Sequence, residues 1–202
     1  MDNLQIKSSF VNKNLYALSR ILVTVGCLSL VINDAGGNPL PDLLWECNNG
    51  SSTKRSNEST VTSSVSWVAK QGQNKKCFCR SLHSESNQSV EVNLDVLFPP
   101  KVPNVSTDSV NVESTINKII NTSLVIHCNS TGNPEPNFIW LLPDKSISKG
   151  DALIINHIDM SNKGTYYCKA ENMLNPSNGN VEIGRSEVSI DVHLLKIQNF
   201  KV

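Results

Sequence analysis

The chain has 202 residues and no formal net charge, because 18 basic residues balance 18 acidic ones. Such a chain has no long-range field that would draw it to nucleic acid or to an anionic membrane surface, so neither is an expected partner. The length suits two domains of about 100 residues, each with a core small enough to gain stability from disulfides.

Short apolar runs separated by Gly and Pro fill the chain, and no segment of helical length shows a 3.6-residue period. Many short strands with turn signals between them predict an all-β fold of sandwich type. No apolar stretch reaches the roughly 20 residues that a membrane helix needs. We therefore expect contact with a membrane only through segments absent from this chain.

Residues 21–32 allow two interpretations. One is a strand with a single face in a core, because four apolar residues alternate there. These residues are Ile21, Val23, Val25 and Cys27. The other is the apolar centre of a signal peptide, with Arg20 before it and Ala35 near a cleavage point.

The strand is the favoured interpretation of this segment. Cleavage near residue 35 would make Cys47 the first core cysteine, too close to Cys79, and would put Trp67 too late in the chain to be the central core tryptophan. The strand interpretation leaves no leader visible, so we expect a fragment, a truncated gene model or an unusual isoform.

The two halves of the chain repeat one pattern. Residues 36–41 (GGNPLP) match residues 132–136 (GNPEP), and each segment is followed by an apolar run that ends in a tryptophan, Trp45 or Trp140. This repeat predicts two copies of one domain, over residues 1–99 and 100–202. Residues 98–103 (FPPKVP) lie between them, and their prolines predict a short, stiff connection.

The second half carries the clearer strand pattern. Leu124, Ile126 and Cys128 alternate, and Trp140 follows twelve residues after Cys128. Leu153 and Ile155 alternate next, then Gly164-x-Tyr166-x-Cys168, and residues 186–192 alternate as a last strand.

This spacing of cysteines, tryptophan and tyrosine resembles an I-set immunoglobulin domain. The resemblance implies a Cys128–Cys168 disulfide across the core, Trp140 packed on it, and Tyr166 in the tyrosine corner. Closing a loop of about 40 residues stabilises the fold by roughly 4 kcal/mol in the chain-entropy model. Asn162 stands where the family usually has Asp, which puts the salt bridge of that Asp in doubt. Two free thiols in a cytosolic sandwich are the alternative for the cysteine pair.

The first half is the poorer copy. Residues 79–81 (CRS) and 92–102 (VNLDVLFPPKV) resemble a C2-set domain of nectin- and nephrin-type adhesion receptors. The resemblance implies that Cys27 and Cys79 form the core disulfide and that Trp45 lies in the core.

Cys47 and Cys77 have no place in the family pattern. If Trp45 lies opposite Cys79 on adjacent antiparallel strands, then Cys47 lies opposite Cys77 on the same side of the sheet. Directly opposite residues are about 4.5–5.5 Å apart at Cα, which is within disulfide range. We therefore predict an additional disulfide, with two free thiols as the alternative.

Six Asn-x-Ser/Thr sequons together with the cysteine pattern indicate a secretory route. The candidate glycosylation sites are Asn49, Asn57, Asn87, Asn104, Asn121 and Asn129.

Other chemistry finds little support. Cys77, Cys79 and His83 have some of the spacing of a metal site, but the strands already account for both cysteines, so no metal and no cofactor is expected. No Gly-x-Ser-x-Gly and no phosphate loop occurs, so no catalytic residues are assigned and the chain is not expected to be an enzyme. Trp67 is interpreted either as a core residue or as an exposed binding aromatic.

The expected function is extracellular recognition in cell adhesion, by a secreted or cell-surface protein. The expected partner is a protein ligand or counter-receptor, homophilic or heterophilic, and adhesion contacts of this kind gain strength from multivalency. Alternatives are a soluble defence protein, an ectodomain fragment of a receptor kinase or phosphatase, and a spacer in a matrix protein.

Overall fold

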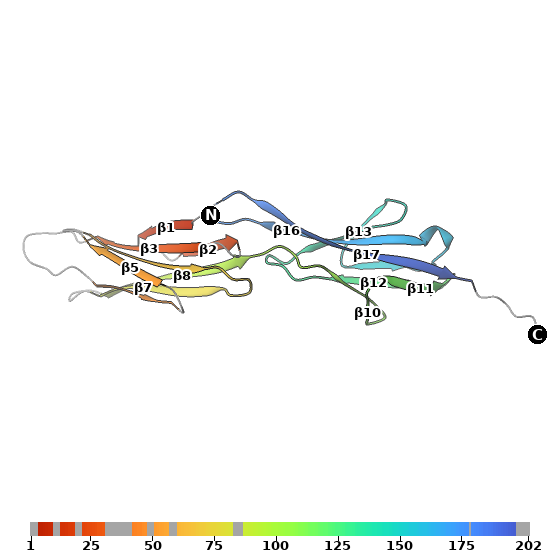
Figure 1. Cartoon of the computed structure of the whole chain (residues 1–202), viewed down its shortest axis with the longest axis horizontal. Coiled ribbons are helices and arrows are strands. Elements are labelled where there is room, and N and C mark those ends of the chain that lie inside the picture. The colour runs from red at the N-terminus through yellow and green to blue at the C-terminus, as the bar shows by residue number, and fades with distance from the viewer. Residues whose placement is uncertain are drawn as a thin grey trace, which may run out of the picture. The chain divides into compact units, whose positions relative to one another are not determined.

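The computed structural model describes residues 4–9, 13–18, 22–30, 42–47, 51–56, 60–82, 87–177 and 179–196. Strands dominate, and the described residues include one short 3-10 helix, η1 (Met160–Asn162), so the all-β prediction is confirmed (Figure 1). The chain divides into two compact units: unit 1 holds residues 1–97 and 175–181, and unit 2 holds residues 98–174 and 182–202. The backbone of Phe98, the first residue of unit 2, bridges to Asn133 in the same unit.

Unit 1 is a sandwich of two four-stranded sheets. Their orders are β1-β3-β6-β5 and β2-β8-β7-β4. The strands are β1 (Leu4–Ser9), β2 (Lys13–Leu18), β3 (Leu22–Leu30), β4 (Asp42–Glu46), β5 (Ser51–Ser56), β6 (Thr60–Val68), β7 (Lys75–Leu82) and β8 (Asn87–Leu97). β1 and β2 pair in parallel with β3 and β8, and neither strand was predicted.

The segment with two interpretations forms strand β3, which pairs with β6. Val23 is fully buried and lies opposite Trp67, whose side chain is 6% exposed and packs in the core of unit 1. Trp67 is therefore a core residue, and its interpretation as an exposed binding aromatic is wrong. Ile21 and the side chains of Val25 and Cys27 lie outside the described parts.

Unit 2 is a sandwich of a four-stranded and a five-stranded sheet. Their orders are β10-β9-β12-β15 and β11-β17-β16-β13-β14. The strands are β9 (Asn104–Thr107), β10 (Val110–Val112), β11 (Thr115–Ile119), β12 (Leu124–Asn129), β13 (Asn137–Leu141), β14 (Ile147–Lys149), β15 (Ala152–Ile155), β16 (Gly164–Leu174) and β17 (Glu182–Leu195). Leu124 and Ile126 from one sheet are buried together with Ile190 and Val192 from the other, as the alternation predicts.

The two units differ in their edge strands, and unit 2 has the additional edge strand β10, which pairs with β9. In unit 1, β5 pairs with β6 and extends the sheet of β1 and β3. In unit 2, β14 pairs with β13 and widens the sheet of β16 and β17 to five strands. The sequence repeat therefore predicts the shared core of the two sandwiches but not the placement of their edge strands.

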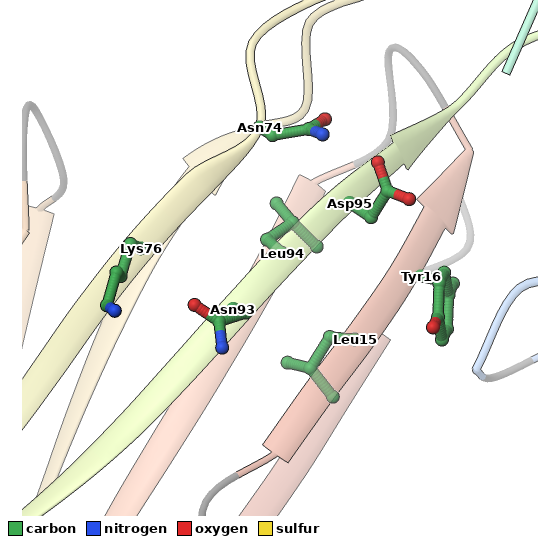
Figure 2. A pocket seen from close by; sticks show the side chains of 7 residues that line it. All are labelled: Leu15, Tyr16, Asn74, Lys76, Asn93, Leu94 and Asp95. Carbon is green, nitrogen blue, oxygen red and sulfur yellow. The ribbon is translucent and has the colours of Figure 1, made fainter.

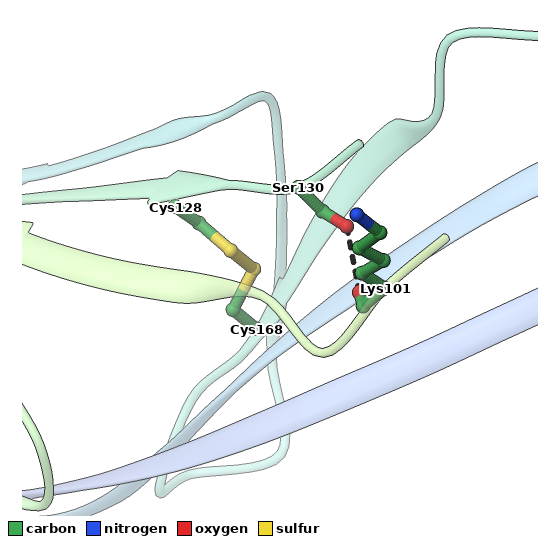
Figure 3. The surroundings of a disulfide bond; sticks show 4 residues. All are labelled: Lys101, Cys128, Ser130 and Cys168. Carbon is green, nitrogen blue, oxygen red and sulfur yellow. Dashed lines mark hydrogen bonds between the residues drawn. A yellow bond between two sulfur atoms is a disulfide. The ribbon is translucent and has the colours of Figure 1, made fainter. Parts of the chain in front are cut away.

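The proline-rich segment after β8 is held by backbone hydrogen bonds within unit 2. Phe98 exchanges two of them with Asn133, at 2.9 and 3.1 Å between nitrogen and oxygen. The Lys101 nitrogen donates to the Thr131 carbonyl at 3.0 Å, and the Ser130 hydroxyl donates to the Lys101 carbonyl at 2.6 Å (Figure 3). These contacts fix the start of unit 2 against the turn that precedes β13.

Candidate interaction surfaces

The disulfide between Cys128 on β12 and Cys168 on β16 lies in the core of unit 2. It joins the two sheets with a Cα–Cα distance of 6.5 Å (Figure 3). Trp140 is fully buried directly opposite Cys168 in the β13–β16 pair. The hydroxyl of the buried Tyr166 donates to the Asn162 carbonyl at 2.7 Å, which is the tyrosine corner that the resemblance implies. Burial, with the charge of Asp144 as a lesser cause, raises the pKa of Tyr166 to about 12.

Asn162, which departs from the family pattern, completes the capping box of the short helix η1, whose N-cap is Asp159. Its side-chain oxygen accepts from the Asp159 nitrogen at 2.9 Å, and the Asp159 carboxylate in turn accepts from the backbone of this helix. A neutral amide satisfies the backbone here without an ion pair, and the Asn162 carbonyl remains the acceptor for Tyr166.

Unit 1 contains the additional disulfide. Cys47 is bonded to Cys77 with a Cα–Cα distance of 4.7 Å, and Trp45 lies opposite Cys79, which is the register from which the bond is predicted. Cys79 is also disulfide-bonded. The Cys27 side chain lies outside the described side chains, so the Cys27–Cys79 pairing stays a prediction.

Among the described residues no three His, Cys, Asp or Glu side chains group closely enough to hold a metal ion. Cys77 and Cys79 are in disulfides, and His83 lies outside the described ranges. Within the described ranges no helix is long and apolar enough to cross a membrane.

Two of the sequon asparagines lie side by side on the outer face of the four-stranded sheet of unit 2. Asn104 on β9 and Asn129 on β12 are directly paired and both exposed, while their neighbours Val105 and Cys128 are buried. Asn121 is exposed in the turn between β11 and β12. None of these three asparagines lies on β13, β14, β16 or β17 of the five-stranded sheet.

The side chains of the three sequon asparagines of unit 1 lie outside the described ones. Asn87 begins β8, and its side chain is outside those described. Asn49 and Asn57 lie outside the described residues.

The outward side chains of β13, β14, β16 and β17, four of the five strands of the larger sheet, form a surface called here the GFC face, where G stands for β17, F for β16 and C for β13. Strand pairing arranges most of them in four rows. The rows are Ile147, Leu141, Tyr167 and Ser189; Lys149, Ile139, Lys169 and Glu187; Asn137, Glu171 and Arg185; and Met173 and Ile183. Several large apolar side chains in these rows are well exposed, among them Ile147 at 66% and Met173 at 63%.

Charged side chains fill the middle of the GFC face. The Lys169 ammonium lies 3.6 Å from the Glu187 carboxylate, and the Arg185 guanidinium lies 3.0 Å from the Glu171 carboxylate. These four residues, with Ser186, line a shallow depression of about 480 Å³. Exposed pairs of this kind stabilise a fold by less than about 1 kcal/mol, so they leave the charges available to a partner.

A second shallow depression, of about 420 Å³, lies over β2, β7 and β8 of unit 1 (Figure 2). It is lined by Leu15, Tyr16, Asn74, Lys76, Asn93, Leu94 and Asp95. Its polar groups serve the sheet itself: the Asn74 side chain accepts from the Val96 nitrogen at 3.0 Å, and Lys76 pairs with Glu91 at 2.9 Å. Hydrogen bonds from Lys76 and then Asn93 hold the pKa of Glu91 below its usual value.

The structure therefore distinguishes the surfaces that the sequence could not. The described cysteines, the three tryptophans and Tyr166 lie in the cores or pack against them, so they are not available to a partner. The GFC face was missed, because its charged rows exist only through the pairing of β16 with β17. The sequence pattern that lay on this face was the alternation of residues 186–192, which are part of β17.

Part of the chain matches a known protein family, and several known proteins are similar to it. Residues 103–172 match the family model described as immunoglobulin domain. The chain is 35% identical over 88 residues to "Cell adhesion molecule CEACAM16" of Rattus norvegicus. This match covers 43% of this chain and 21% of that protein. It is 29% identical over 103 residues to "Hemicentin-1" of Mus musculus, over 46% of this chain and 2% of that protein.

A longer match is to "Peroxidasin homolog" of Mus musculus, 25% identical over 154 residues, 68% of this chain and 10% of that protein. The chain thus spans about a fifth or less of the length of these relatives. Among solved structures, the four N-terminal immunoglobulin domains of Dscam1 isoform 6.9 match with a TM-score of 0.56 at 18% identity, over 92% of this chain and 44% of that one. This likeness shows the fold.

Proposed function

This chain belongs to the immunoglobulin superfamily, and on that premise we propose that it is an extracellular recognition protein that binds another protein through the GFC face of unit 2. The observation that carries the proposal is the placement of the sequons. Asn104 and Asn129 lie on the opposite face of the same sandwich, and Asn121 lies in a turn at its end. Glycans there would cover the four-stranded sheet and leave the GFC face as the accessible protein surface.

The composition of the GFC face supports the same proposal. Exposed apolar side chains surround a charged centre, and Tyr167, a residue type enriched where proteins bind, is 37% exposed among them. The depression at its centre is shallow and rimmed by charges, which suits a protein surface better than a small molecule, whose sites are concave and mostly apolar.

The names of the relatives support adhesion as the context. One rat relative and one mouse relative are called cell adhesion molecules, and each match covers 43% of this chain. Disulfides at Cys47–Cys77 and Cys128–Cys168 suit an oxidising, extracellular setting. A secreted or cell-surface location and a non-catalytic role are parts of this proposal.

The chain offers a matched pair of glycan variants that test which face binds. Glu187→Asn creates the sequon Asn-Val-Ser with the native Ser189 on the GFC face, and Glu113→Thr completes a sequon with Asn111 on edge strand β10 of the other sheet. Each variant removes one carboxylate and adds one glycan, and the two glycans lie on opposite sheets; Glu187→Asn also removes the ion pair with Lys169.

The test uses the full chain, secreted from eukaryotic cells behind a heterologous signal and coupled to fluorescent beads. The beads are presented to an array of extracellular protein domains that includes the chain itself, and to cells, and glycan occupancy is checked by intact mass. We expect wild-type and Glu113→Thr beads to bind and Glu187→Asn beads to lose binding. Binding retained by Glu187→Asn would exclude the GFC face, and a wild type that binds nothing would overturn the proposed function.

A further inference from the structure

We propose that the protein partner of the GFC face is a second copy of this chain, docked face to face. This inference rests on the proposed function and names its partner. It comes from the arrangement of four charges at the centre of the face. Lys169 and Glu171 are outward on β16, and Glu187 and Arg185 lie directly opposite them on β17.

The four charges form a two-by-two checkerboard. Each basic residue has an acidic neighbour across the strand pair, and each has another acidic neighbour two residues along its own strand. The spacing is about 5 Å across the strands and about 7 Å along them. The two diagonals therefore carry like charges, Lys169 with Arg185 and Glu171 with Glu187.

A checkerboard of this kind is complementary to itself. Two identical surfaces in contact are related by a two-fold axis that lies in the plane between them. If that axis runs along the strands, Lys169 meets Glu187 of the second copy and Glu171 meets its Arg185. If the axis crosses the strands between the two rows, Lys169 meets Glu171 of the second copy and Glu187 meets its Arg185. Both arrangements place opposite charges together at all four positions.

The rest of the GFC face agrees with a neutral, self-matching surface. Its outward positions on β14, β16 and β17 hold three basic and three acidic side chains, so a second copy meets no net repulsion. These are Lys149, Lys169, Arg185, Glu171, Glu187 and Asp191. The same two axes bring apolar side chains together beside the charges: Met173 meets Ile183 with the first axis, and Tyr167 meets Met173 with the second. Sulfur–aromatic contacts of the second kind are favourable.

The size of the face predicts a weak contact between two copies. The four rows and four strands cover roughly 15 Å by 20 Å, well below the 800 Å² or so per partner of a standard interface. Exposed ion pairs add modest affinity and are screened by salt. We therefore expect monomers in dilute solution and association only where many copies share one surface, which multivalency strengthens.

The test is clustering of beads that carry many copies of the full chain, in two colours. Wild-type beads are expected to cluster, and Lys169→Glu, Glu171→Lys and Glu187→Lys beads are each expected to cluster at least about tenfold less, because like charges then face each other. Clustering should return when Lys169→Glu beads are mixed with Glu187→Lys beads if the axis runs along the strands. It should return with Glu171→Lys beads if the axis crosses them.

Rescue by a mixture cannot be explained by misfolding, because both partners in the mixture are the impaired variants. Glu113→Lys, an exposed charge reversal next to β10, is the matched control and should cluster like wild type. Rescue in either mixture supports the second copy as partner, and failure of both overturns it. Wild-type beads that do not cluster but bind another protein, with loss in Glu187→Asn, would overturn this inference and leave the proposed function intact.

Discussion

The side-chain nitrogen of Asn172 on β16 donates to the Phe98 carbonyl at 3.0 Å and to the Pro134 carbonyl at 2.7 Å. One buried amide, 4% exposed, thus ties the end of β16 to the segment that opens unit 2 and to the turn before β13. The contact is close because Gly184 on β17 has no side chain, which lets Pro99 and the Asn172 amide share the space beside it.

Replacing Asn172 is expected to destabilise unit 2 according to the hydrogen bonds lost. Asn172→Ala leaves the Pro134 carbonyl without its donor and should cost about 1–3 kcal/mol in the free energy of unfolding. Asn172→Asp should cost more at pH 7, because a carboxylate would face two carbonyl oxygens. Chemical unfolding measures both, with the exposed Asn137→Asp as control. An Asp variant as stable as wild type would contradict this role.

Gly184→Ala is expected to disturb the same site by crowding alone. A Cβ atom there would lie 2.8 Å from Pro99 Cβ and 2.9 Å from its Cα, closer than such atoms approach. Overpacking of this kind typically costs about 1–3 kcal/mol. Thermal unfolding should show a lower midpoint for this variant than for Ser189→Ala on the same strand. Equal midpoints would mean that residues 98–100 can move aside without loss.

Tyr166→Phe is expected to lower the stability of unit 2 by about 1 kcal/mol at pH 7, because the hydroxyl loses its hydrogen bond to the Asn162 carbonyl. The difference should depend on pH. The folded state raises the pKa of Tyr166 to about 12, so its phenol stays neutral in the folded state after the unfolded state begins to ionise.

The stability that neutral Tyr166 contributes is therefore complete below about pH 10 and is lost as the pH rises toward 12. The phenylalanine variant lacks this loss, so the gap between the two proteins should narrow above about pH 10. Unfolding by denaturant at a series of pH values measures it, and the other tyrosines cancel because both proteins have them. A gap that stays constant to about pH 11 would contradict a buried, neutral phenol.

Removing the additional disulfide is expected to weaken unit 1. The bond between Cys47 and Cys77 spans 30 residues, and the chain-entropy model gives about 3.5 kcal/mol for a loop of that length. The Cys47→Ser, Cys77→Ser double variant should therefore unfold at lower denaturant concentration. Non-reducing peptide mapping of the wild type should recover the two cysteines in one linked pair. Recovery of Cys47 as a free, alkylated thiol would contradict the bond.

The paired sequons make a prediction about glycans. Asn104 and Asn129 are Cα partners, so two glycans would start from adjacent strands on one face. Asn104→Gln and Asn129→Gln should each lower the intact mass of the secreted chain by one glycan, and neither should reduce binding through the GFC face. Loss of binding in either variant would place the partner on the four-stranded sheet.

The sequence by itself determined the local pattern of both cores. The alternation of Leu124, Ile126 and Cys128 requires only that one side of a strand be apolar, and the spacing from Trp140 to Cys168 is a property of the chain. The repeat between the halves likewise needs no coordinates. The same reasoning missed β2, in which Leu15 and Ala17 alternate, because its parallel pairing with β8 joins residues far apart in the chain.

What only the tertiary structure decided is which residues stand beside each other across strands. Asn104 lies 25 positions before Asn129, and Lys169 lies 18 before Glu187, so no local pattern relates them. Their adjacency follows from the register of paired strands, which is set by packing of the buried faces and by the turns that join them. The outward faces share that register, so the face with the paired sequons and the charged checkerboard became visible only once the sandwich was assembled.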